Sequence, residues 1–239
     1  MRYLFLLFLS AGLYADNEIF VTQTGSNASV DLEQLGGSNL IGGTSAVSGT
    51  MTALDLDGAS MILDINQIGS SNIFRSDAID GSNFTGFFEF DGDSNVWDLL
   101  VDSTGLLGSD YINMNIDVTG SSNVADIKIA ENAAADYLDL DWIVTGDSNQ
   151  FDFDIDYENA TNYMDVNGSS NTINFNGSGF AGNSQATSGY FYMDLDGSSN
   201  TFNVTQASTL ARDWLKITSN GSNSNICIVQ NDGGVATSC

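Results

Sequence analysis

Residues 67–72 read Gln-Ile-Gly-Ser-Ser-Asn, and the last four of these residues follow the pattern Gly-x-Ser-Asn. Variants of the pattern occur at residues 25–27, 58–61, 81–83 and 221–225. Self-similarity at a period between about 20 and 50 residues is typical of a solenoid, in which each repeat packs only on its neighbours. The seven full copies begin and end at Gly36 and Asn39, Gly69 and Asn72, Gly92 and Asn95, Gly120 and Asn123, Gly146 and Asn149, Gly168 and Asn171, and Gly197 and Asn200.

The spacing of these turns divides each coil into two strands. Between Asn39 and Asn95 the turns recur about every 11 residues, so two turns make a coil of about 22 residues. Beyond Asn95 a longer loop replaces every second turn, which predicts about nine coils of roughly 22–29 residues. We expect one edge of the solenoid to carry the arcs ending at 27, near Gly49, and at 72, 95, 123, 149, 171, 200 and 225, and the opposite edge to carry those ending at 39, 61 and 83.

Apolar and polar residues alternate on both sides of the arcs, as residues 151–156 show with Phe-Asp-Phe-Asp-Ile-Asp. Alternation with a period of two residues predicts half-buried strands, so the predicted fold is an all-β, two-sheet β-solenoid. The residue two before each Gly should face inward: Gln34, Leu56, Gln67, Ile79, Phe90, Val118, Val144, Val166 and Leu195. The residue two after each Asn should also face inward: Trp97, Ala125, Phe151, Ile173, Phe202 and Cys227.

The residues of each arc suit a stacked turn. Glycine permits positive φ where the chain reverses, and serine forms local hydrogen bonds to the turn backbone. An asparagine repeated at one position of every rung can bond to the asparagines above and below, as in cross-β ladders; the alternative is that these residues are simply good turn formers. Gln23, Gln34 and Gln67 are predicted to point inward as well.

The composition excludes most catalytic chemistry. The 239 residues include no histidine, no proline and two cysteines, and 31 acidic against 5 basic residues give a net charge of −26. Histidine-based triads and zinc sites are therefore impossible, and nucleic acids and anionic membranes are disfavoured partners. Carboxylate pairs recur on almost every rung, so they mark no enzyme active site, and we expect no enzyme activity and no cofactor. Rows of Asp could bind Ca²⁺, but a solvated acidic face is the favoured interpretation.

The two termini carry further signals. Residues 1–15 combine Arg2, an apolar run and small residues, which predicts a cleaved secretory signal peptide followed by one solenoid domain over residues 16–239. The apolar run is too short to span a bilayer, so we expect no membrane insertion. Cys227 and Cys239 are candidates for a disulfide in an oxidising compartment, either within one chain or between neighbours.

Residues 34–39 and 67–72 match the Gln-x-Gly-x-x-Asn core of curlin repeats, and residues 23–27 give a version one residue shorter. The sequence thus resembles a divergent member of the curlin-repeat family, the major subunits of curli fibres. The resemblance implies an extracellular functional amyloid of a biofilm matrix at the surface of a Gram-negative-type bacterium. It also implies export through an outer-membrane pore and nucleation by a minor subunit. After Asn72 the inward Gln is replaced by apolar residues, which departs from the family pattern.

Both ends of the predicted solenoid read as strands and not as capping helices, at residues 17–23 and 226–230. An uncovered strand edge is a template for another strand. We therefore expect head-to-tail self-assembly into fibres, with the protein itself as its main partner. The alternative is a monomeric or capped adhesin, with or without stabilising calcium, in which exposed tyrosines bind a ligand: Tyr111, Tyr137, Tyr163 and Tyr192.

Overall fold

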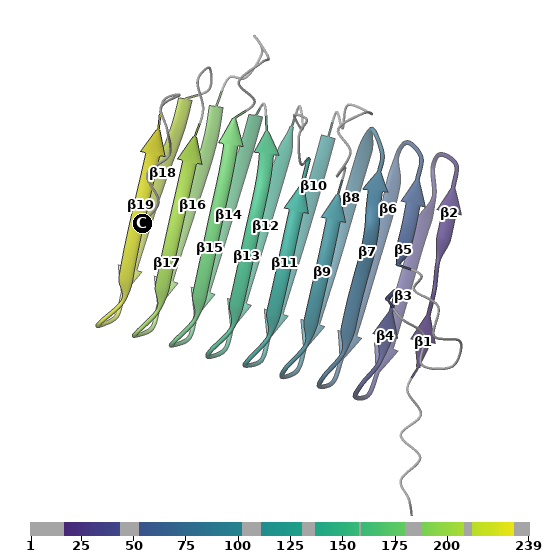
Figure 1. The fold of residues 1–239 in the computed structure, drawn as a ribbon, viewed down its shortest axis with the longest axis horizontal. Coiled ribbons are helices and arrows are strands. Elements are labelled where there is room, and N and C mark those ends of the chain that lie inside the picture. The colour runs from purple at the N-terminus through teal and green to yellow at the C-terminus, as the bar shows by residue number, and fades with distance from the viewer. Residues whose placement is uncertain are drawn as a thin grey trace, which may run out of the picture.

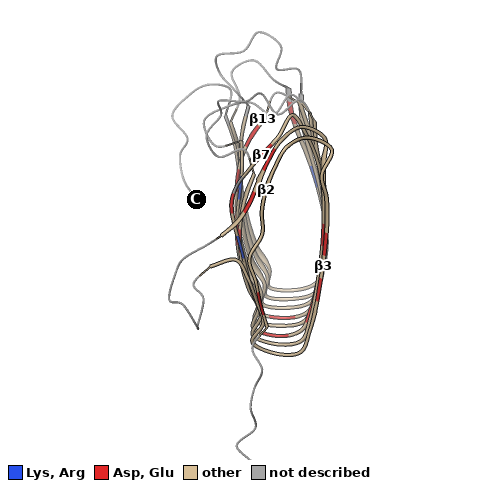
Figure 2. Ribbon diagram, turned by 90° about the vertical axis from the view of Figure 1, so that its right-hand side faces the viewer, with Lys and Arg blue, Asp and Glu red and all other residues tan. Residues whose placement is uncertain are grey.

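The structure is a computed structural model, and it describes residues 17–43, 53–101, 111–130, 137–157, 159–179, 188–207 and 212–231. Regular secondary structure in these ranges is β-strand throughout, arranged in two parallel sheets that face each other (Figures 1 and 2). The prediction of an all-β, two-sheet solenoid is confirmed. The predicted signal peptide, Gly49 and Cys239 lie outside the described residues.

From residue 29 to residue 41 and from residue 54 to residue 231, successive strands of the chain belong alternately to the two sheets. Sheet A contains β1 (Glu18–Ile19), β2 (Thr22–Thr24), β4 (Leu40–Ile41), β5 (Leu54–Asp57), β7 (Ile73–Asp80), β9 (Val96–Val101), β11 (Val124–Ile129), β13 (Gln150–Tyr157), β15 (Thr172–Gly179), β17 (Thr201–Ala207) and β19 (Asn225–Asn231). Sheet B contains β3 (Ser29–Leu35), β6 (Met61–Ile68), β8 (Asn83–Asp91), β10 (Tyr111–Thr119), β12 (Leu138–Thr145), β14 (Asn159–Asn167), β16 (Ser188–Asp196) and β18 (Arg212–Asn220).

Most inner strands lie in register between the strands of the previous and the next coil, although β7 shifts register against β5 and β9. β10, for example, pairs in parallel with β8 and β12 over most of its length. Equivalent arc residues are 22 to 29 residues apart in most coils, as predicted, but Asn39 and Asn72 are 33 apart. Sheet B contributes one strand per coil and has eight strands among the described residues, so the number of coils is slightly below the predicted nine.

The assignment of the first two arcs to the edges of the solenoid was wrong. Gly36 donates its N–H to the carbonyl of Ile68, so the arc at residues 36–39 stacks on the arc at 69–72. Gly25 donates to Asp57, which places the arc at residues 25–27 on the opposite edge, next to the arc at 58–60. The first coil is longer than the others, so counting from one arc to the next at a constant period exchanged the two edges.

The core lies between the sheets and runs the length of the solenoid. All nine residues predicted to face inward before an arc are buried, with exposures of 3% or less. Aromatic rings fill the middle coils in an almost continuous series; Phe90 stacks on Trp97 at a centroid distance of 4.0 Å, and Phe175 stacks on Phe191 at 4.2 Å. Each two-strand coil is too thin to bury these rings alone, so the coils above and below complete its core.

Candidate self-assembly interface

The arcs can stack directly on one another because of their backbone conformation. In the arc at residues 146–149, Gly146 has φ 143° and Ser148 has φ 61°; in the other full copies the glycine φ lies between 118° and 155° and the serine φ between 60° and 62°. A Cβ atom on Gly146 would overlap the carbonyl of Gly120 in the preceding coil. Glycine is therefore required both by conformation and by the close approach of neighbouring coils. The serine, predicted only to bond locally, occupies the left-handed region.

The arc asparagines form a buried ladder. Each of the seven is at most 1% exposed, and its Oδ1 accepts a hydrogen bond from the backbone N–H of the ladder residue in the preceding coil, except at Asn39, where the chain of bonds begins. The N–H of Asn95, for example, donates to Oδ1 of Asn123 over 2.8 Å. The ladder therefore runs from backbone to side chain and not from amide to amide. In each coil, the backbone N–H of the ladder residue is buried and has no partner in the strand pairing. The ladder supplies the acceptor for this N–H.

A second ladder, on the outside of the same edge, was not predicted. From Ser70 to Ser198, the side chain after the arc glycine accepts a hydrogen bond from the backbone N–H of its counterpart in the next coil; Ser121 N–H donates to Asp93 Oδ1 over 2.6 Å, and Asp147 N–H donates to Ser121 Oγ over 3.2 Å. Serine separates the aspartates, so no two carboxylates are direct neighbours in this row. The second ladder could have been predicted from position x of Gly-x-Ser-Asn, because x alternates between Ser and Asp in these coils.

Glutamine side chains bond along the axis near both ends. Nε2 of Gln67 donates to Oε1 of Gln34 over 2.8 Å, and both side chains are buried in sheet B. Gln23 lies in sheet A, not beside them; it is half-buried, and its Nε2 donates to the Thr24 carbonyl over 3.3 Å. A further pair was missed: Nε2 of Gln230 donates to Oε1 of Gln206 over 2.9 Å at the C-terminal end.

Inward-facing apolar side chains are exposed on the last coil. Ile226 and Ile228 of β19 are 37% and 46% exposed, whereas their neighbours Phe202 and Val204 on β17 are fully buried. At the N-terminal end, the apolar residues of β1 to β3 that pack against the core are only partly buried. The described residues contain no helix that could cover either end. Within the described ranges, both ends therefore present parallel strand edges without a paired strand, with apolar side chains between them.

The final arc is shifted by one residue from its predicted position. Ser224, not Asn225, takes the ladder position, since its Oγ accepts the N–H of Asn200 over 3.3 Å. Ile226 then pairs with Phe202, and Cys227 pairs with Asn203 on the outer side. The prediction that Cys227 faces inward was therefore wrong, because the last arc has the usual four residues, Gly221 to Ser224, with Asn223 at the left-handed position where earlier arcs have serine. Cys227 is disulfide-bonded, and the predicted partner, Cys239, lies outside the described residues.

The acidic side chains raise one another's pKa where they meet on neighbouring rungs. Burial raises the pKa of Asp98, and the carboxylate of Asp126 on the next coil raises it further, while Arg75 and Lys128 oppose the change. Burial and neighbouring carboxylates likewise raise the pKa of Asp80, Asp139 and Asp165. In the described part of the chain, no three carboxylate or cysteine side chains lie together in a way that could hold a metal ion.

Tyr157 ties the last coils together, and sequence reasoning gave it no role. Its buried hydroxyl donates to Oδ1 of Asp213 over 2.7 Å, which joins β13 in sheet A to β18 in sheet B. Burial and the Asp213 carboxylate raise the pKa of Tyr157 far above its ordinary value. The ring occupies space that a side chain on Gly177 or Gly189 would fill. Only the two glycines at 177 and 189 could have indicated this packing.

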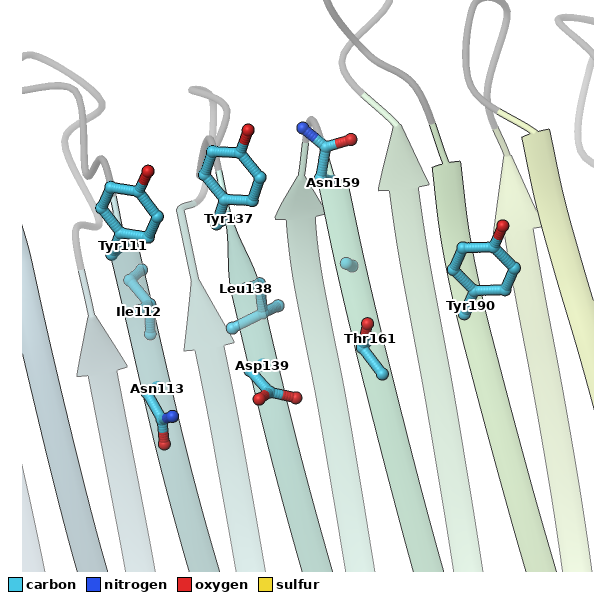
Figure 3. A pocket seen from close by; sticks show the side chains of 10 residues that line it. Tyr111, Ile112, Asn113, Tyr137, Leu138, Asp139, Asn159, Thr161 and Tyr190 are labelled. Carbon is cyan, nitrogen blue, oxygen red and sulfur yellow. The ribbon is translucent and has the colours of Figure 1, made fainter.

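Tyrosines also line an open hollow of about 460 Å³ on the outer face of sheet B (Figure 3). Tyr111 and Tyr137 stack there with ring centroids 4.8 Å apart, and Tyr190 and Asp139 complete the rim. Two other predicted ligand-binding tyrosines, Tyr163 and Tyr192, lie on the same sheet outside the hollow. Exposed aromatic planes beside polar groups suit a ligand with apolar faces and hydroxyl groups.

Comparison of the chain with protein-family models, curated proteins and solved structures finds no match. In the part of the chain that the structure describes, no helix has the length and apolar character needed to cross a membrane. The arcs and the two ends are therefore the features of the molecule that bear on its function.

Proposed function

We propose that this protein is a secreted structural subunit that self-assembles head-to-tail into extracellular fibres and has no enzymatic role. The observation that carries the proposal is the pair of open ends, where β18 and β19 at one end and β1 to β3 at the other have no further strand paired to them among the described residues. A second copy stacked on the axis would cover Ile226 and Ile228 and continue the backbone pairing. Assembly would repeat between molecules the packing that each molecule already uses between its coils.

The curlin-like motifs support a more specific setting. By this resemblance the fibre is curli-like and belongs to the matrix at the surface of a Gram-negative-type bacterium. The signal-like residues 1–15 support export, and the same resemblance supplies an outer-membrane pore and a nucleating subunit as partners. No cofactor is part of the proposal. The buried Gln34–Gln67 pair and the Asn ladder are the features of this chain that support the resemblance.

The acidic surface should make assembly depend on salt. A net charge of −26 repels a second copy, and at physiological ionic strength the Debye length is about 8 Å, longer than the spacing of about 4.8 Å between rungs. We therefore expect faster assembly as salt concentration rises. Electron microscopy and sedimentation of purified protein across a salt series would measure this.

The decisive test compares an end variant with a side variant. Ile228→Asp places a charge on the open end, and Ile62→Asp places the same charge on the outer face of sheet B, where Ile62 is 45% exposed. We expect filaments from the wild type and from Ile62→Asp, and monomers from Ile228→Asp. Circular dichroism establishes that both variants fold. Monomers of the wild-type protein at high salt and high concentration would overturn the proposal.

A second candidate function is adhesion through the tyrosine hollow. The stacked Tyr111–Tyr137 pair beside Asp139 favours a glycan as ligand, because sugar rings present apolar faces and hydroxyl groups. A glycan array with the wild type and Tyr137→Ala tests it. Binding that Tyr137→Ala removes supports adhesion, and the absence of binding by the wild type refutes it.

A further inference from the structure

Each position of a strand along the solenoid axis is called a level here. The two sheets do not have the same number of levels. Sheet A runs through nine levels from β1 to β19, with β2 and β5 sharing the levels of β1 and β4, whereas sheet B runs through eight levels from β3 to β18. Every strand of sheet B is joined by an arc to the following strand of sheet A. The additional level in sheet A is therefore residues 17–24, which contain β1 and β2, at the N-terminal end.

This difference matters when one molecule stacks on another. If β19 pairs with residues 17–24 of an intact neighbour, sheet A continues, but β18 and the neighbour's β3 are left two levels apart. With a spacing of about 4.8 Å between strands, sheet B would have a gap wide enough for one strand at every junction. Backbone groups on both sides of the gap would lack partners, which is costly wherever water is excluded.

Residues 17–24 and the last strand of sheet A carry similar side chains at their inward positions. Going along the two segments from their ladder positions, Asn17 corresponds to Ser224, Ile19 to Ile226, Val21 to Ile228 and Gln23 to Gln230. The residues of one segment can therefore occupy the environment of the other without a change of register. Residues 17–24 are also the less firmly held of the two, since they pair with sheet A at five positions, whereas β19 pairs with β17 at seven.

We propose that assembly proceeds by strand exchange, in which β19 of one molecule replaces residues 17–24 of the next. β19 then pairs with β4 and β5 of the neighbour, and β18 pairs directly with the neighbour's β3. Both sheets become continuous, and Ser224 continues the asparagine ladder toward Asn39. This inference rests on the proposed function, because it specifies the junction of the same fibre.

The edges that meet in sheet B match in charge and polarity. Extending the observed register from β18 to the neighbour's β3 places Lys216 opposite Asp31. The same register places Leu215 opposite Val30 and Ile217 opposite Leu32, all on the inward side. Within one molecule the row that contains Lys216 begins with two aspartates, Asp31 and Asp64. The single positive charge of this row thus lies at the end where it can meet the negative end of the next copy.

The axial rise per subunit tests the exchange in filaments of the full chain. Strand exchange advances the fibre by eight levels per molecule, or about 38 Å, whereas stacking of intact molecules advances it by nine, or about 43 Å. Helical reconstruction by electron cryomicroscopy resolves this difference. A rise near 38 Å supports the exchange. A rise near 43 Å overturns it but leaves the proposed function intact, and the absence of filaments refutes the proposed function itself.

Two further measurements check the strands involved. In the filament, residues 17–24 are released, so a glutamate-specific protease should cleave after Glu18 faster than it does in the monomer; protection of Glu18 in the filament would overturn the exchange as stated.

Lys216→Asp should slow elongation about fivefold, and adding Asp31→Lys should restore the rate to within about twofold. No rescue by the double variant counts against the exchange, because intact stacking holds the two side chains about 10 Å apart, beyond the Debye length of about 8 Å.

Discussion

The middle coils and the end coils use the same backbone but differ in what covers their inward side chains. In the middle, Trp142 and Phe151 are fully buried and lie edge to face, with ring centroids 5.0 Å apart. At the C-terminal end, aliphatic residues and glutamine take the same inward positions and stay exposed, as Ile226 and Gln230 show. Since the fold of a coil does not by itself bury these positions, the coil that follows has to do so. The contrast indicates that the ends are incomplete without a neighbour.

The largest expected loss of stability comes from removing a large buried side chain from a middle coil. Trp142→Ala removes the largest fully buried side chain and should lower the free energy of unfolding by about 3–5 kcal/mol. Ile228→Ala, at an inward position of the end coil where the side chain is 46% exposed, should change it by less than about 1 kcal/mol. Chemical denaturation of monomeric protein measures both values. Equal losses in the two variants would contradict the distinction between middle and end coils.

A smaller loss is expected when the ladder is interrupted in the middle. Asn123→Ala removes the acceptor for the buried N–H of Asn95 and should cost about 1–3 kcal/mol. Asn113→Ala, on the exposed outer face of β10, is the matched control and should cost less than about 0.5 kcal/mol. Chemical denaturation measures the free energy of unfolding of both variants. A cost for Asn113→Ala that matches the cost for Asn123→Ala would mean that the buried ladder contributes nothing specific.

Removing the hydroxyl oxygen of Tyr157 should weaken the contact between the middle coils and the C-terminal end. Tyr157→Phe keeps the ring but removes the hydrogen bond to Asp213, and should cost about 1–2 kcal/mol. Because β18 is held through this bond, amide hydrogen exchange should accelerate in β18 and β19 more than in β10 and β12. Tyr111→Phe, on an exposed ring, serves as control and should leave the exchange pattern unchanged. Uniform acceleration along the chain after Tyr157→Phe would contradict the local role of the bond.

The smallest effect is a dependence of stability on pH that involves both regions. The pKa values of Asp80, Asp98, Asp139 and Asp165 are raised above their ordinary value of 3.8, so the folded chain binds protons more tightly than the unfolded chain. This stabilisation is complete below pH 3.8 and is lost as pH rises through the raised values. The Tm should therefore rise as pH falls from 7 toward 4, and Asp98→Asn should reduce the slope. A Tm that falls over this range would show that other groups dominate.

The fold could be predicted from the sequence because one short motif carries most of the constraint. Gly146 and Asn149, like their counterparts, have to stand at fixed positions in every coil, and the alternation in residues 151–156 sets which side chains face inward. Both features are local and visible in the chain. Together they determine the strands, the arcs and the core residues without reference to long-range contacts.

The errors arose where one coil differs from its neighbours. The added length between Asn39 and Asn72 exchanged the two edges, and the last arc ends in Ser224 where the earlier arcs end in asparagine, so the pattern indicated Asn225 as its last residue. The Tyr157–Asp213 bond joins residues 56 apart and depends on where two glycines leave space, so no period in the sequence indicates it. The Gln206–Gln230 pair follows from register, which only the stacked strands reveal.

The most direct test of head-to-tail assembly is X-ray diffraction from aligned fibres of the purified protein. If coils continue from one molecule to the next, the reflection at about 4.8 Å lies on the meridian, parallel to the fibre axis, and the sheet spacing of about 10 Å lies on the equator. Fibres with the 4.8 Å reflection on the equator would mean that molecules associate side by side. That result would contradict assembly through the ends.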